Sequence, residues 1–399
     1  MTYLGPVVET SAVTAGTRTC AGVLAEPLRP EHAVNVIATN DSVTPIDERT
    51  MGGLLSRYNV TVDTIEICHS RLASTCRHQG QVRQKWNADD SMADLPLTES
   101  ENANTADLDL LDTREMLRRI NDEDGKVANA VALEIDVIAT AVDAIAPRLR
   151  AGGRLHYFGA GTSGLLAVLN AAEIPPTFSA KDLVIGHIAG GSRALTDAVE
   201  AAEDDAAAGA AEVDRAGIAA HDAVIGISAS GGAAYVMGAV QRARDAGALT
   251  IAIVNTPDSE LAALVNIAIA VNTGPEVLAG STRMKAATAQ KLVLNSISTA
   301  VMVKLGKVHG NLMVDLRASN AKLRARALRL AMTLSGASSA VAKAALEGNE
   351  WHVKLAIVQI VAGATTPAQA AELLESAGGS LRAVLDRYPR QESHPLHRT

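Results

Sequence analysis

A glycine-rich loop is the first group of residues whose spacing suggests chemistry. Gly159, Gly161 and Gly164 follow the pattern G-x-G-x-x-G, and Thr162 and Ser163 stand between the last two glycines. Glycines let the backbone approach an anion closely, and the free N–H groups at a helix N-terminus stabilise negative charge. The motif therefore predicts that Gly161, Thr162 and Ser163 bind a phosphate, carried by either a dinucleotide or a sugar.

The residues after the next apolar runs favour a sugar phosphate. The second run ends in Ile188–Gly191, with no carboxylate where the ribose of a dinucleotide would be held. Hydroxyl side chains follow two further runs, namely Ser228 and Ser230, and then Ser281 and Thr282. Each loop alone fits an ordinary turn or helix cap equally well. Several such loops at one sheet edge suit one compact phosphate, so these four residues are predicted to bind it as well.

Five short apolar runs must position these loops. They alternate with Ala-rich segments of helical length, and most are apolar on both faces, as in a buried parallel sheet. The pattern predicts a doubly wound α/β fold with a mainly parallel five-stranded sheet. The predicted strands are Leu155–Phe158, Leu183–Ile188, Ala223–Ile227, Leu249–Val254 and Ile267–Val271.

Helices are predicted on both sides of this region. Apolar residues recur at steps of three and four over Val131–Ile145, and the acidic cluster Asn121–Asp124 is expected at the start of that helix. A second long helix presents an apolar face between Leu294 and Leu305, and a small helical module with a turn at Gly378-Gly379 closes the chain. These helices supply the layers that a parallel sheet needs.

Composition excludes several classes of function. The chain has 399 residues and a net charge of −8 with no basic stripe, which argues against nucleic acid as a partner. No run is apolar enough to span a membrane and no secretory signal is evident, so the cytoplasm is the expected location. The cysteines are Cys20, Cys68 and Cys76, and their spacing predicts neither a disulfide framework nor a metal site.

The chain resembles the N-acetylmuramic acid 6-phosphate etherase family from residue 94 to residue 399. The first loop looks like the phosphate loop of the sugar isomerase (SIS) fold, and other segments look like signatures of the etherases. The segments that carry the resemblance are Tyr157–Gly164, Ala172–Thr177, Val199–Asp205, Gly280–Lys285, Thr288–Lys291 and Leu305–Asp315.

The resemblance implies a reaction and two catalytic residues. Family members remove the D-lactyl ether from C3 of an amino-sugar 6-phosphate, without metal or organic cofactor, as part of peptidoglycan recycling. The resemblance places the catalytic acid on Glu173 and the second catalytic carboxylate, the base, on Glu203. Each has a plainer interpretation, because Glu173 stands before Pro175-Pro176 at a helix end and Glu203 lies in an acidic run that suits a solvated surface.

The resemblance also implies an arrangement of domains and subunits. It leaves residues 1–93 unexplained, and these residues, which show no motif, are expected to form a poorly ordered extension. It predicts N-terminal helices over 94–148, the SIS domain over 149–330 and a three-helix module similar to ubiquitin-associated domains over 331–399. A chain beginning at Met92 is expected to fold and keep its activity. Family members form homodimers with the sugar site near the subunit interface.

Several positions depart from the family pattern. Leu165 and Gly232 stand where relatives usually carry arginine, and Ala233 replaces a threonine. Lys285 and Lys291 remain as candidates for anion binding, although a lysine on a helix is more often solvated. Because both catalytic carboxylates are present, the reaction type is better supported than the substrate.

Two other functions fit the same fold. An aldose–ketose isomerase would also move a C2 proton, and a sugar-phosphate-sensing regulator would bind without chemistry, as in the glucokinase regulatory protein, which resembles these etherases. Carboxylates in one cleft with the phosphate loops favour catalysis, whereas carboxylates far from them favour sensing.

Overall fold

The computed structural model describes residues 97–318 and 320–389. All of these residues belong to one compact unit. The predicted extension over residues 1–93, its three cysteines and the proposed start at Met92 lie outside the described residues. In the part that is described, no helix is long and apolar enough to cross a membrane.

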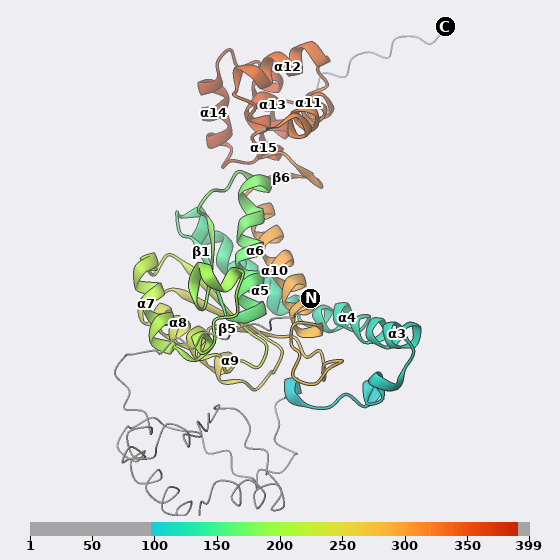
Figure 1. Cartoon of the computed structure of the whole chain (residues 1–399). Coiled ribbons are helices and arrows are strands. Elements are labelled where there is room, and N and C mark those ends of the chain that lie inside the picture. Colours follow the sequence, from blue (N-terminus) through green and yellow to red (C-terminus); the bar gives the residue numbers. More distant parts are fainter. Residues whose placement is uncertain (1–96, 319, 390–399) are drawn as a thin grey trace, which may run out of the picture. The chain divides into compact units, whose positions relative to one another are not determined.

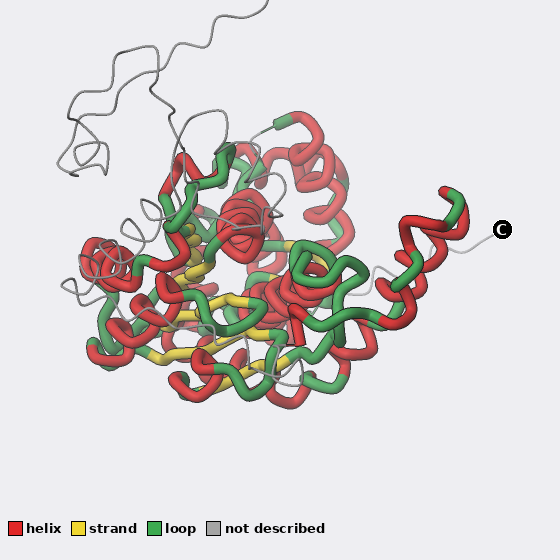
Figure 2. The backbone as a smooth tube through the Cα atoms, turned by 60° about the horizontal axis from the view of Figure 1, so that its bottom comes forward, coloured by secondary structure: helices red, strands yellow, loops and turns green. Residues whose placement is uncertain are grey.

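The predicted five-stranded parallel sheet is confirmed. Its strand order is β2-β1-β3-β4-β5, and all neighbouring strands run parallel. Figure 2 shows the strands side by side with helices on either face. The strands are β1 (Leu155–Gly159), β2 (Val184–Ile188), β3 (Ala223–Ser228), β4 (Leu249–Val254) and β5 (Ile267–Ala270).

Helices cover both faces of the sheet (Figure 1). Because side chains alternate along a strand, Tyr157 packs into one apolar cluster with α5, α6 and α10, while Phe158 packs into a second with α7, α8 and α9. The helices are α5 (Ile135–Arg150), α6 (Gly161–Phe178), α7 (Ala206–Ala216), α8 (Ala234–Asp245), α9 (Glu260–Leu264) and α10 (Lys285–Lys304). The short 3₁₀ turns η8 (Gly191–Leu195) and η9 (Ala202–Asp204) connect β2 to α7.

The acidic cluster Asn121–Asp124 forms the end of a helix rather than the start of one. It closes α3 (Thr113–Asp124), and α4 (Val127–Ala132) follows after a single turn. Glu123 is buried and accepts a hydrogen bond of 2.7 Å from the buried Lys285 Nζ at the start of α10. The cluster therefore ties the N-terminal helices to the sheet domain instead of interacting with the dipole of the next helix. The 3₁₀ turns η5 (Leu97–Glu99), η6 (Ala103–Thr105) and η7 (Leu108–Leu110) precede α3.

Replacing Lys285 with Met is expected to destabilise the fold by about 3 kcal/mol, because one partner of a buried ion pair is lost. Burial opposes the charge on Glu123, but hydrogen bonds from Lys126, Lys285 and Asn104 outweigh it and lower the pKa of Glu123 to about 2. The contribution of Glu123 to stability is thus present above the usual carboxyl pKa and lost as pH falls towards 2. Urea unfolding of the variant near neutral pH measures the loss.

Lys304→Met is the matched control for this prediction. Lys304 lies on the same helix and pairs with Asp143 at 2.8 Å, but both side chains are about half exposed. Removal of this surface ion pair should lower the free energy of unfolding by less than about 1 kcal/mol. Equal losses in the two variants would show that the buried pair contributes no more than a surface pair.

The C-terminal helices share a third apolar cluster that runs from Val314 to Val384. A short hairpin, β6 (Val308–His309) and β7 (Leu312–Met313), precedes it. The cluster includes five helices where three were predicted, and the expected boundary between residues 330 and 331 falls inside the first of them. They are α11 (Ala321–Ser335), α12 (Ser339–Gly348), α13 (Val353–Ala362), α14 (Pro367–Ser376) and α15 (Leu381–Arg387), with the predicted turn at Gly378-Gly379 between the last two.

Candidate functional site

The loop between β1 and α6 has the close geometry that its glycines indicate. A Cβ on Gly159 would lie 2.6 Å from the backbone of Gly164, and one on Gly164 would lie 2.5 Å from the Ile188 side chain. Gly161, the first residue of α6, has φ +51°, a conformation that favours glycine. The first turn of α6 can therefore start directly beneath the end of β1, with its N–H groups facing outward from the sheet edge.

The loop after β3 lies beside this turn. β1 and β3 are neighbours although β2 lies between them in sequence, so their carboxyl ends form the point where the strand order reverses. Ligands of such sheets bind in the crevice at that point. Ser228 Oγ accepts from Gly231 N at 3.0 Å, and Ser230 Oγ accepts from Gly232 N at 3.2 Å. Each hydroxyl keeps its own proton to donate to a phosphate oxygen.

Ser163 is held differently. Its Oγ donates to Gln290 Oε1 at 2.9 Å, Gln290 Nε2 donates to Asn255 Oδ1 at 3.1 Å, and Asn255 Nδ2 donates to the Val271 carbonyl at 3.0 Å. The carbonyl at the end of this chain fixes the orientation of both amides. The Ser163 proton is therefore directed into the protein, and its oxygen is left as an acceptor.

Ser281 and Thr282 stand just before α10, in the long connection that follows β5 in the sequence. Gly280 N donates to the Thr98 carbonyl at 2.9 Å, and the Glu276 carboxylate accepts from the N–H groups of Lys285 and Ala286 at 2.9 Å each. α10, which follows this loop, packs along α6 in one apolar cluster, and its Gln290 contacts Ser163 of the first loop. The five residues after β1 and β3 thus lie at the reversal of strand order, and Gln290 joins α10, the helix that follows Ser281 and Thr282, to the first loop.

Glu173 lies away from these loops. It follows Gly161 by twelve residues on α6, which is about 18 Å along the helix axis and towards the opposite edge of the sheet. Its Oε2 lies 2.8 Å from Lys291 Nζ of α10, with 56% of the side chain exposed. Leu169 and Leu165, one and two turns earlier on the same face, are also exposed. Within one chain, Glu173 does not meet the phosphate loops.

Glu203 lies near the carboxyl edge. The segment before it lies against the end of β2, since a Cβ on Gly190 would lie 2.9 Å from the Val199 side chain, and Ala202 packs in the same cluster as Ala160 and Ala189, which follow β1 and β2. Ala201 has φ +60°, a strained conformation for alanine that turns the chain here. Loss of hydration, and then the Asp204 carboxylate, raise the pKa of Glu203 above its usual value, although the residue is exposed.

Some of these contacts escaped the sequence interpretation. Lys285 is neither solvated nor free for a ligand, because it is buried against Glu123. The amides of Gln290 and Asn255 were not recognised, although Gln290 adjoins Lys291 in a segment that resembles the family. Among the described residues, no group of three His, Cys, Asp or Glu side chains is arranged to hold a metal ion.

Comparison with known proteins identifies the family. Residues 137–244 match the glucokinase regulatory protein N-terminal SIS domain, and residues 206–300 match the SIS domain. The N-acetylmuramic acid 6-phosphate etherase of Caldanaerobacter subterraneus subsp. tengcongensis is 50% identical over 290 residues, which are 72% of this chain and 94% of that protein. The etherase of Mycolicibacterium smegmatis is 47% identical over 72% of this chain and 97% of its own length. The chain belongs to the N-acetylmuramic acid 6-phosphate etherase family.

A solved structure adds less. The phosphoheptose isomerase of Neisseria gonorrhoeae aligns with 48% of this chain and 98% of its own, at 20% identity and a TM-score of 0.39, a likeness too low to bear on function. Identity near one half with etherases, over most of their length, carries the assignment instead.

Two residues of α6 differ in their surroundings. Leu165, where arginine is usual, is 41% exposed on α6. Asn170, on the same helix, is buried and donates to Asn295 Oδ1 of α10 at 3.1 Å. The exposed part of α6 and α10 therefore includes the apolar side chains Leu165, Leu169 and Leu292.

Proposed function

We propose that the chain cleaves the D-lactyl ether of N-acetylmuramic acid 6-phosphate, giving N-acetylglucosamine 6-phosphate and D-lactate, in the cytoplasm and as part of peptidoglycan recycling. The observation that carries the proposal is the identity of about one half with curated etherases over most of their length. The phosphate-loop geometry at the reversal of strand order supports it, since that crevice suits a small anionic ligand.

The chemistry requires one base and one acid. In the ring-opened sugar, the C1 aldehyde acidifies the C2 proton, which Glu203 removes. The C3–O bond then breaks, and Glu173 gives a proton to the departing lactate oxygen. Water adds at C3 of the unsaturated aldehyde and C2 regains a proton, so the net change is the addition of one water. Side chains acting as general acid and base account for these steps without a further cofactor.

The phosphate of the substrate is assigned to the loops at the sheet edge. Gly161 and Thr162 lie in the first turn of α6, where backbone N–H groups face the crevice. Ser228 and Ser230 keep a proton to donate, whereas Ser163 holds the loop through Gln290. Ser281 and Thr282 complete the set from the start of α10.

The separation of Glu173 from these loops supports a homodimer. Glu173 is about 18 Å along α6 from the phosphate loop, so it reaches a sugar only in the site of a second subunit. It lies on a face with exposed Leu165, Leu169 and Leu292, and apolar exposed surface of this kind favours association. Lys291, 2.8 Å from Glu173, is the cation that would pair with the lactyl carboxylate.

Incubation of the full chain with N-acetylmuramic acid 6-phosphate, followed by an enzymatic D-lactate assay, tests this function. Release of D-lactate together with N-acetylglucosamine 6-phosphate is expected. Interconversion of an aldose and a ketose phosphate without lactate release would favour the isomerase. Tight sugar-phosphate binding with no turnover would favour a regulator.

Replacing Asp204 with Asn is expected to move the acid limb of kcat/KM to lower pH. The base works when deprotonated, and the raised pKa of Glu203 keeps it protonated to a higher pH than an ordinary glutamate. Removal of the Asp204 charge lowers that pKa, although the larger effect of lost hydration remains. The pH dependence of D-lactate release measures the shift.

Asp197→Asn removes an exposed charge from the same connection between β2 and α7 and should leave the limb in place. If Asp204→Asn leaves the acid limb in place, that limb reports the titration of a group other than Glu203.

A further inference from the structure

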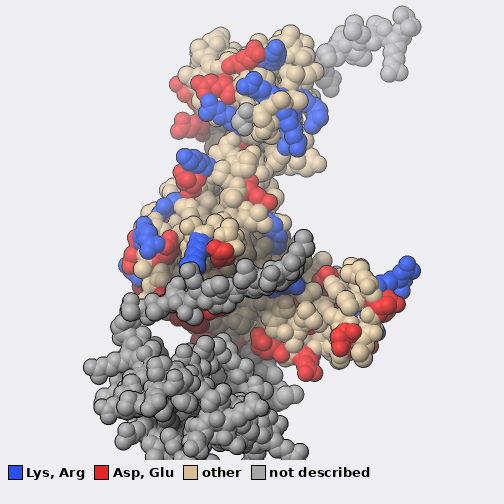
Figure 3. All heavy atoms as spheres, viewed as in Figure 1, with Lys and Arg blue, Asp and Glu red and all other residues tan. Residues whose placement is uncertain are grey.

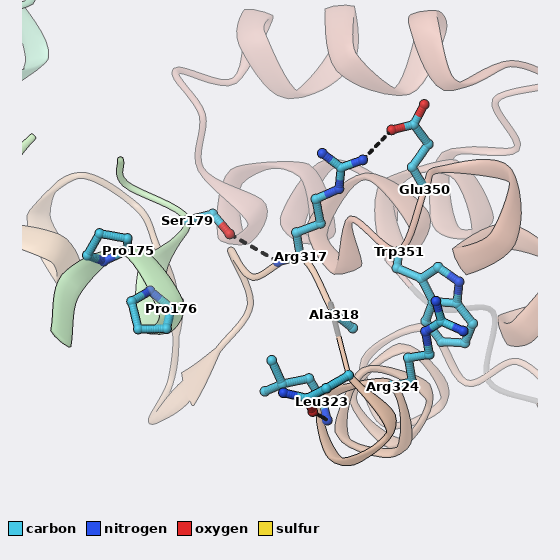
Figure 4. Close-up of a pocket in the computed structure, with 10 residues that line it drawn as sticks. Pro175, Pro176, Ser179, Arg317, Ala318, Leu323, Arg324, Glu350 and Trp351 are labelled. Carbon is cyan, nitrogen blue, oxygen red and sulfur yellow. Dashed lines mark hydrogen bonds and ion pairs between the residues drawn. The ribbon is translucent and has the colours of Figure 1, made fainter. Parts of the chain in front are cut away.

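A cavity lies far along α6 from the phosphate loops. It has a volume of about 580 Å³ and is bounded by the end of α6, the start of α11 and the turn before α13. Figure 4 shows Pro175, Pro176 and Ser179 on one side and Arg317, Arg324 and Trp351 on the other. Its volume is within the range of small-molecule sites.

The backbone around this cavity is held in a costly conformation. Glu350 and Trp351 have φ of +50° and +64°, values that side-chain-bearing residues rarely adopt. Hydrogen bonds hold this turn, since Ala318 N donates to the Trp351 carbonyl at 3.2 Å and Trp351 N donates to the Leu346 carbonyl at 2.7 Å. Backbone strain of this kind clusters at ligand sites, where it positions the side chains in advance.

The side chains on the wall combine positive charge with a flat apolar surface. The Arg324 guanidinium lies 4.9 Å from the centre of the Trp351 ring, and among the described residues it has no carboxylate within ion-pair distance. Arg317 pairs with Glu350 at 2.6 Å, but both side chains are more than half exposed, so the pair is weak and open to exchange. Pro175 and Pro176 face them from α6 (Figure 4).

A helix N-terminus adds to this positive charge. Asn320 caps α11 by accepting from Leu323 N at 2.9 Å and lines the cavity, so the first turn of a 15-residue helix opens beside it. Helix N-termini and arginines both favour phosphate. Figure 3 shows blue basic atoms gathered on the C-terminal helices, where α11 carries Lys322, Arg324, Arg326 and Arg329.

We propose that this cavity is a second ligand site, separate from the phosphate loops at the sheet edge, and that it binds a sugar phosphate. The phosphate lies between Arg317, Arg324 and the start of α11, and it replaces the Glu350 carboxylate on Arg317. The sugar ring lies against Trp351 and the two prolines. None of the wall residues belongs to the phosphate loops, and Glu173, the proposed acid two residues before Pro175, does not line the cavity.

Trp351 supplies a direct measurement. The chain contains two tryptophans, Trp86 and Trp351, so the full-length Trp86→Phe variant reports on the cavity alone. Titration with N-acetylglucosamine 6-phosphate is expected to change Trp351 fluorescence to saturation. In the same background, Arg324→Gln should raise Kd at least about tenfold, because a charge-assisted hydrogen bond is lost. Unphosphorylated N-acetylglucosamine and inorganic phosphate should each bind more weakly than the sugar phosphate.

Two controls separate this site from the other. Arg329→Gln removes an exposed charge from the same helix outside the cavity wall and should leave Kd unchanged. Ser281→Ala weakens the proposed catalytic site and should leave the Trp351 signal intact. Absence of a saturable signal, or a signal lost in Ser281→Ala but kept in Arg324→Gln, would overturn the proposal. The fluorescence readout needs no turnover, so its result stands apart from the lactate assay.

Discussion

Exchange of the C2 proton with solvent deuterium is expected to stop when Glu203 is replaced with Gln. The amide keeps the shape of the side chain but cannot take a proton, and general base catalysis contributes about 10²–10⁴-fold. Lactate release should fall by the same factor, because ether cleavage follows proton removal. Proton NMR of N-acetylmuramic acid 6-phosphate in deuterated buffer follows the C2 signal, and a D-lactate assay follows the cleavage.

Glu200→Gln is the control for this loss, since Glu200 is an exposed carboxylate in the same connection. It should exchange the C2 proton at the wild-type rate. Near-normal exchange in Glu203→Gln would assign the base to another residue. Complete absence of exchange in the wild-type chain with any amino-sugar 6-phosphate would favour the regulator.

The sheet could be predicted from sequence because its signal is local. Each strand is a short apolar run, and the observed strands differ from the predicted ones by no more than one residue at each end. The C-terminal helices were harder to predict. Their cluster begins at Val314, before the first of its helices, and only packing between distant residues reveals where such a cluster starts. The acidic cluster Asn121–Asp124 was misplaced for a similar reason, because its partner Lys285 lies 162 residues away.

The candidate site was predictable in type but not in arrangement. Glycine spacing identified the loop at Gly159–Gly164, and the strand order brings Ser228 and Ser230 beside it. Sequence alone gave no sign that Ser163 donates into the Gln290 amide, because that contact joins α6 to α10. Nor did it show how far Glu173 lies from the phosphate loops, which depends on the direction in which α6 crosses the sheet.

Replacing Glu173 with Gln is expected to block lactate release while leaving C2 exchange. Proton removal by Glu203 comes first, so exchange needs only the base, whereas breakage of the C3–O bond needs the acid. A loss of about 10²–10⁴-fold in lactate release is expected, measured by the same two assays. Glu134→Gln changes a glutamate in the turn between α4 and α5 and should affect neither rate. Equal loss of exchange and cleavage in Glu173→Gln would show that Glu173 takes part in proton removal or in binding.

Mixed dimers test whether Glu173 serves the other subunit. Suppose that one chain carries Glu173→Gln and its partner carries Glu203→Gln. If each site takes Glu203 from one chain and Glu173 from the other, one site of the mixed dimer has lost both carboxylates and the other keeps both. Co-expression with two different tags and purification of the mixed species should therefore recover about half of the wild-type activity per dimer, as symmetry requires.

Each parent dimer has two damaged sites and should stay nearly inactive. A mixed dimer as inactive as its parents, or a chain that is monomeric in solution and still releases lactate, would place the acid within the same chain. In that case another residue nearer the phosphate loops would have to protonate the leaving oxygen, because Glu173 lies too far along α6 to do so.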